Sequence, residues 1–218
     1  MTAQRPDPSP SPIFDDHREA YLKRLADLDL AAIAGRLALA KDPDGLIVPL
    51  FSRSFHVSPR GIFDPDRQPA SYAAFVIICR HLLMCPAREP EDAAWTAFRD
   101  FKDAGPLLVY FANSVEGAIT KAFAGRPEAL QQAGTRMGGQ ILPPGQFAYD
   151  VVMGVAALPK VPVLLLFNDA TEGFAPRCVV LFERRIATYL DMETVAVVGA
   201  YLADGLARRA KDPWPMCQ

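Results

Sequence analysis

The sequence lacks the features that mark most metalloproteins and secreted proteins. It has four cysteines, Cys79, Cys85, Cys178 and Cys217, and none of them forms a CxxC pair. This scatter argues against a zinc knuckle or a cysteine-ligated cluster, and it favours a reducing compartment. The N-terminus is polar and proline-rich, without the apolar stretch of a secretory signal. We therefore expect a cytoplasmic protein.

Long apolar runs and a strong charge of either sign are also missing. The longest apolar run lies near Val161–Phe167, far below the roughly 20 residues that a membrane-spanning helix needs. The formal net charge is −2, so no global basic field attracts nucleic acid or anionic lipid. We expect neither a membrane nor a nucleic acid as partner.

No familiar catalytic motif is present. The sequence contains no Walker loop, GxGxxG, HExxH, GxSxG or EF-hand spacing. This excludes the commonest motif-bearing classes but not enzymes in general. Whether the chain is an enzyme stays open at this point.

Helical periodicity dominates the first two thirds of the chain and returns near its C-terminal end. It predicts helices over 15–40 (in two pieces, the second capped by Asp29), 70–85, 106–124, 127–137 and 191–207. In the helix over 106–124, the buried stripe is predicted to include Leu108, Phe111, Val115 and Ile119. Short strands are expected at 46–50 and 54–57, and Pro49 is expected to place the first at a sheet edge.

The pattern changes in the C-terminal third. Stretches rich in Val, Leu and aromatics predict strands at 147–158, 161–167, 179–182 and 186–189. We predict an α+β fold, with helices packed on a mostly antiparallel sheet, strands concentrated in the C-terminal half and a C-terminal helix. Residues 1–14 are expected to form a disordered proline-rich tail, 15–210 a single domain and 211–218 a flexible tail.

The segment from Phe167 to Pro176 carries the most interesting polar residues. It places Asp169 and Glu172 directly after an apolar strand, where a scaffold often holds site residues. Two carboxylates at this spacing could bind a hard cation or act as acid and base. The same residues also suit an ordinary turn, with Gly173 at positive φ.

Asp150 and His81 allow two interpretations each. Asp150 interrupts an apolar stretch, where it is either directed inward and paired or directed outward and solvated. His81 shares a helical face with Cys85, a pair that could ligate a metal or heme or activate a thiolate. The alternative for His81 is a hydrogen-bonded histidine in the core.

Several strings in the C-terminal half resemble one family. Ala157-Leu-Pro-Lys-Val-Pro162, then Asp169…Glu172-Gly-Phe174-Ala-Pro176, then Leu181-Phe182-Glu183 and Tyr189-Leu190, resemble the uncharacterised prokaryotic domain family DUF3786. The resemblance covers roughly residues 18–207. Some relatives carry an added iron–sulfur module similar to that of corrinoid proteins. The resemblance therefore implies a tetrapyrrole, a corrinoid or a redox protein as partner.

These observations lead to three functional hypotheses. The first is a non-catalytic module that binds a small ligand or cofactor through Asp150, Asp169, Glu172 and Phe174, and the resemblance implies that this ligand is tetrapyrrole- or corrinoid-related. The second is a protein-interaction or assembly factor, which could form a homo-oligomer. The third is a metal-assisted hydrolase that uses Asp150, Asp169 and Glu172. The identity of any cofactor or metal is not predicted.

Overall fold

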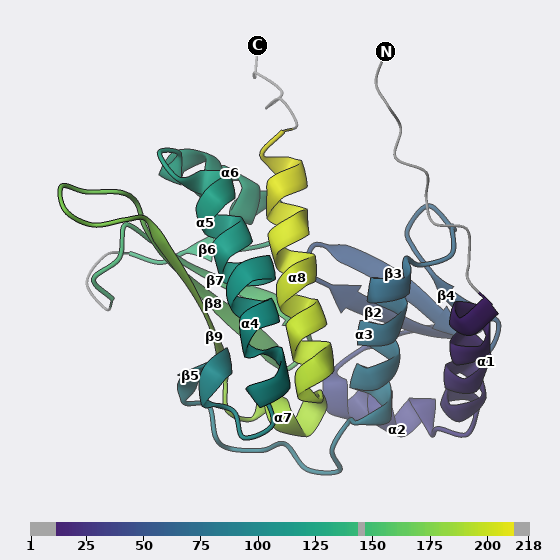
Figure 1. Ribbon diagram of the computed structural model, residues 1–218. Coiled ribbons are helices and arrows are strands. Elements are labelled where there is room, and N and C mark those ends of the chain that lie inside the picture. The colour runs from purple at the N-terminus through teal and green to yellow at the C-terminus, as the bar shows by residue number, and fades with distance from the viewer. Residues whose placement is uncertain (1–11, 144–146, 212–218) are drawn as a thin grey trace.

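The computed structural model describes residues 12–143 and 147–211 (Figure 1). Its strands form two antiparallel sheets, and a long C-terminal helix runs beside the helices that pack on them. This is the α+β class that the sequence predicts. Most of the predicted tails, 1–14 and 211–218, lies outside the described residues.

The first sheet is built from the N-terminal third of the chain. Its order is β1-β2-β3-β4, formed by Ala40–Asp42, Gly45–Leu50, Arg53–Ser58 and Gly61–Phe63. The two predicted strands are confirmed, but the edge position inferred from Pro49 is wrong, because β2 lies between β1 and β3. β1 pairs with β2 only as far as Ile47. Pro49 lies beyond that stretch, where a missing N–H removes no bond to β1.

The second sheet uses the apolar stretches of the C-terminal third. Its order is β5-β9-β8-β7-β6, formed by Trp95–Ala97, Arg177–Glu183, Val161–Asn168, Val151–Leu158 and Gln140–Ile141. The strand predicted at 186–189 is wrong, because Ile186–Tyr189 is the short helix α7. Ile186 and Tyr189 are both buried, and this spacing of three is helical rather than alternating.

Three N-terminal helices pack near the first sheet. They are α1 (Pro12–Ala26), α2 (Leu30–Leu37) and α3 (Tyr72–Leu83). As predicted, the side chain of Asp29 caps α2, accepting from the Ala32 N–H at 3.0 Å. Ser71 caps α3 in the same way through the Ala74 N–H. These caps explain why both helices begin where they do.

The helix predicted over 106–124 contains a π-helical turn. It comprises η2 (Gly105–Leu107), α4 (Leu108–Phe111), the π turn η3 (Ala112–Gly117) and α5 (Ala118–Phe123), and a separate helix α6 (Pro127–Arg136) follows. Phe111, Val115 and Ile119 are buried as predicted. Leu108 is exposed, which corrects its place in the predicted stripe.

The same helix protects an open edge of the second sheet. β5 ends where the short helix η1 (Phe98–Asp100) begins, so it pairs with β9 only at Leu181–Glu183 and leaves the start of β9 without a neighbouring strand on that side. Upstream, the N–H of Cys178 donates to Thr120 Oγ1 at 3.0 Å, and that of Val180 donates to Glu116 Oε1 at 3.1 Å. Side chains thus take the place of a missing strand.

Helix α8 (Met192–Arg209) completes the core. Asp191 caps it by accepting from the Thr194 N–H at 2.8 Å, and Arg208 and Arg209 end it, in accord with the helix dipole. One face, with Val195, Val198 and Leu202, is fully buried. In Figure 1, α8 (yellow) runs between α4–α5 and α3.

His81 lies in this core without a hydrogen bond. Its side chain is fully buried in α3, and neither ring nitrogen has a partner among the described residues. Its ring lies 5.9 Å from that of Tyr189. Burial lowers the pKa of His81 to about 4. The core interpretation holds for its position, but the hydrogen bonds expected with it are missing.

Candidate functional site

The structure brings Asp150 and Asp169 together at one end of the second sheet. Asp150 lies just before β7, not within a strand, and Asp169 lies just after β8. Because Val151 pairs with Phe167, the two aspartates become neighbours. The Asp169 N–H donates to Asp150 Oδ2 at 2.7 Å, and the Asp150 N–H donates to the Asn168 side chain at 3.0 Å.

These carboxylates bind backbone amides. Asp169 Oδ1 also accepts from the N–H groups of Gly125 and Ala170, both at 2.8 Å. Phe174 is 76% exposed and borders the same shallow depression, whereas Glu172 is exposed and does not line it. No group of three His, Cys, Asp or Glu residues that could hold a metal ion occurs in the described part of the chain.

A second hollow lies beside α8. It has a volume of about 490 Å³ and is bordered by the β2–β3 turn, the start of α3, Tyr110 of α4, the end of α6 and α8 from Val197 onward. Its residues on α8, Val197, Ala200, Tyr201, Asp204 and Arg208, follow helical spacing and share one face. We call this hollow the α8 cleft. The opposite faces of α8 thus serve the core and the cleft.

Phe51 forms one wall of the cleft in a strained conformation. Phe51 and Ser52 form the two-residue turn between β2 and β3, and Phe51 has φ of +52°. Glycine is favoured at such a position, and another residue there costs about 1–3 kcal/mol. The Phe51 N–H donates to the Ala157 carbonyl at 2.8 Å. The Phe51 ring stacks on the Tyr201 ring, with 5.7 Å between the ring centroids and 7° between the ring planes. These two contacts hold the turn against its strain.

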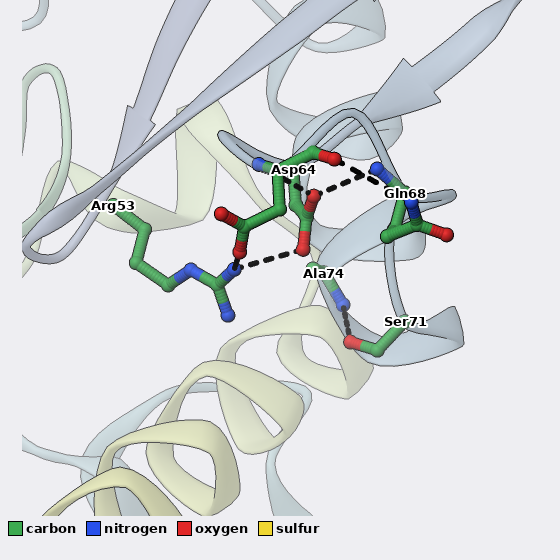
Figure 2. A network of polar contacts seen from close by, with 6 residues as sticks. Arg53, Asp64, Gln68, Ser71 and Ala74 are labelled. Carbon is green, nitrogen blue, oxygen red and sulfur yellow. Dashed lines mark hydrogen bonds and ion pairs between the residues drawn. The ribbon is translucent and has the colours of Figure 1, made fainter.

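Arg53, the first residue of β3, borders the cleft and pairs with a preorganised loop. Its guanidinium pairs with Asp64 Oδ2 at 2.9 Å (Figure 2). Asp64 is itself held by the N–H groups of Asp66 and Gln68, which donate to Oδ1 at 3.0 and 2.9 Å. Figure 2 places this network above the capped start of α3 at Ser71. The loop therefore fixes the side chain of Arg53 relative to α3.

Two further arginines reach the cleft from the end of α8. Arg208 pairs with Asp204 at 2.7 Å. Arg209 donates to Ser52 Oγ at 3.1 Å and to the Arg136 carbonyl at 3.2 Å, which fastens α8 to the turn and to α6. Burial raises the pKa of Tyr201, while Arg53, Arg209 and Arg208 act in the opposite direction. All three cations therefore act at the Tyr201 hydroxyl.

Comparison with known proteins gives one result. The family model for a domain of unknown function, DUF3786, matches residues 29–204. The chain belongs to the DUF3786 family. No curated protein and no solved structure gives a significant match.

Both hollows lie on elements that this DUF3786 match covers, apart from the last turn of α8. Sequence reasoning found Asp150 and Asp169 but missed the α8 cleft. The available signals were Tyr201 and Arg208 on the outer face of the last predicted helix and a phenylalanine between two strand predictions. Each of these is common in helices and turns, so neither indicates a site by itself.

Proposed function

We propose that this DUF3786 chain is a non-catalytic ligand-binding module, with the α8 cleft as its site. The observation that carries the proposal is the convergence of an aromatic pair, Phe51 and Tyr201, with arginine side chains in a hollow of about 490 Å³. Ligand sites in proteins are typically hollows of about 300–1,000 Å³, with apolar walls and a few placed polar groups. The strain at Phe51 supports the same site, because backbone strain concentrates at functional positions.

The depression with Asp150, Asp169 and Phe174 stays a second candidate for the same function. Its carboxylates already accept backbone N–H groups, so fewer of their lone pairs remain for a ligand. Tyr149 and Arg177 also line it and could contribute to binding. If this depression is the site, Phe174→Ala should weaken binding, because Phe174 is the large apolar side chain exposed there.

The ligand suggested by the family resemblance is a tetrapyrrole or corrinoid. Arginines at the α8 cleft could pair with the carboxylates that tetrapyrroles carry, and Tyr201 could contact a flat macrocycle. Titration with haemin and with a corrinoid, followed by visible absorption, tests this choice. If the spectrum of each mixture equals the sum of the spectra of the protein and the free ligand, both haemin and the corrinoid are excluded as ligands.

The decisive experiment compares a blocked cleft with an open one. Ala200 lines the cleft on α8, and Ala31 is an exposed alanine on α2. We would purify the full chain and the variants Ala200→Trp and Ala31→Trp under native conditions, and measure bound small molecules by native mass spectrometry. We expect the wild type and Ala31→Trp to carry a molecule that Ala200→Trp lacks.

Two results would overturn the proposal. One is a wild-type protein with no bound molecule and no melting shift in a metabolite screen. The other is retention of the molecule by Ala200→Trp, with a circular-dichroism melt like that of the wild type. Retention there together with loss in Phe174→Ala would assign the ligand to the second depression.

The other two hypotheses make different predictions. An interaction or assembly factor would form a stable oligomer, and light scattering measures that. A metal-assisted hydrolase would need Asp150, Asp169 and Glu172 to converge, and Glu172 does not line the depression of the other two. No long apolar helix suited to crossing a membrane occurs in the part of the chain that the structure describes.

A further inference from the structure

The charge of the α8 cleft differs from that of the whole protein. The chain has a formal net charge of −2. The residues that line the cleft include Arg53, Arg208 and Arg209 and one acid, Asp204. Asp64, at 2.9 Å, and Asp66, at 3.9 Å, pair with Arg53 from outside this lining. An excess of one charge along the wall of a hollow attracts ligands of the opposite charge, so the lining itself favours an anion.

One of these arginines can change partners at small cost. Arg208 is 77% exposed and pairs with Asp204, which is 60% exposed, one helical turn away. An exposed ion pair of this kind contributes little to stability, because water screens it and both side chains lose freedom, so a ligand anion can replace or join Asp204. Arg53 is 41% exposed but its partner Asp64 is only 17% exposed, so a ligand anion joins that pair and does not replace Asp64. Arg209 serves a different purpose, because it bonds to Ser52 and to the α6 end.

Apolar side chains form much of the remaining wall of the cleft. Tyr201 presents a half-buried ring, and Val197 and Ala200 continue the same face of α8. Tyr201 is held in its orientation by the parallel stack on Phe51. A planar apolar group on a ligand can lie against this face, in the way that aromatic anchors are used at recognition sites. The arginines and this wall border one hollow.

We propose that the α8 cleft binds a small anion with a flat apolar body, whose phosphate or carboxylate group lies between Arg53 and Arg208 and whose body packs on Tyr201. Guanidinium groups suit both anions, because their fork of N–H groups matches two oxygens at once. This inference rests on the proposed function, since it specifies the ligand class of the same cleft.

The test uses phenyl phosphate and benzoate as anionic probes and phenol as the neutral probe. Binding is measured by calorimetry and by NMR shifts of α8 amides, with the full chain at low salt. We expect phenyl phosphate or benzoate to bind at least tenfold more tightly than phenol. Inorganic phosphate and acetate are then compared as competitors of the bound probe, and the stronger competitor shows whether the cleft prefers a phosphate or a carboxylate group.

Matched arginine variants separate the specific site from general charge. Arg60 pairs with Asp44 at 2.9 Å, is 75% exposed and lies away from the cleft, so Arg60→Gln is the control for Arg208→Gln. We expect Arg53→Gln and Arg208→Gln each to weaken the anionic probe about tenfold, with phenol binding unchanged. Tyr201→Leu should weaken all three probes.

The outcomes distinguish failure of this inference from failure of the proposed function. If Ala200→Trp abolishes binding of phenol but the arginine variants bind every probe as the wild type does, the cleft binds ligands and the anion assignment is wrong. If Arg60→Gln weakens binding as much as Arg208→Gln does, the effect is general charge, and the inference also fails. If Ala200→Trp leaves all binding intact, the proposed function itself is wrong.

Discussion

Replacing His81 should remove much of the acid sensitivity of this protein. The imidazole is fully buried, its ring nitrogens have no hydrogen-bond partner among the described residues, and burial lowers its pKa to about 4. In the unfolded chain a histidine has a pKa of about 6.5. The unfolded state therefore takes up a proton first as the pH falls, and the free energy of unfolding decreases between pH 6.5 and 4.

The magnitude follows from the two pKa values. At pH 4.5, linkage between pKa values of 6.5 and about 4 removes about 2–3 kcal/mol of the stability present at pH 7.5. Other groups titrate in this range too, so the wild-type loss alone does not isolate His81. The informative quantity is the difference between wild type and variant in the change of unfolding free energy from pH 7.5 to 4.5.

The assay is urea unfolding of His81→Leu, His81→Gln and wild type at both pH values. Both variants should lose about 2–3 kcal/mol less than the wild type on acidification, because neither side chain titrates. They should differ at pH 7.5, where Leu avoids the cost of an unpaired polar group in the core and Gln retains it. Equal losses for all three proteins would refute the assigned environment of His81.

Three further predictions concern the backbone and the core. Phe51→Ala should lower the unfolding free energy by about 3 kcal/mol through loss of the buried ring. Phe51→Gly should be about 1 kcal/mol less destabilising than Phe51→Ala, because glycine accepts φ of +52° without strain. Urea unfolding measures both variants, and a lower unfolding free energy for Phe51→Gly than for Phe51→Ala would contradict the strain. Glu116→Ala leaves the buried Val180 N–H without its acceptor and should lower the unfolding free energy by about 1–3 kcal/mol. Glu116→Gln keeps a side-chain oxygen and should lower it by less, and similar losses for the two variants would argue against this hydrogen bond. Gly199→Ala places a Cβ 2.7 Å from Phe111 Cε2 and should lower thermal stability by about 1–3 kcal/mol; an unchanged melting temperature would mean that Phe111 moves freely.

The sequence predicted the helices well because their signals are local. Asp29 as a cap, Pro127 as a helix start and the stripe Phe111–Val115–Ile119 can be read within a single element. Strand pairing is not local, so nothing indicated that the strands form two sheets. Ile186–Tyr189 shows the limit, because four residues are too few to separate helical from strand periodicity.

The candidate sites divide along the same line. Asp150 lies near the start of one strand prediction and Asp169 follows the end of the next, and a hairpin brings such positions together. The α8 cleft combines Phe51 with Tyr201, residues far apart in the chain, so no local pattern reports it. The positive φ of Phe51 was equally hidden, since glycine is the residue that normally signals it.

The order of elements along the chain means that the cleft is completed late during synthesis. Its β2–β3 wall is translated early, but its other wall is α8, which also completes the core. A chain still on the ribosome can form early helices and hairpins, yet it has no complete pocket until α8 has emerged. The ability to hold a ligand therefore arises together with the finished fold, and a chain interrupted before α8 would have neither.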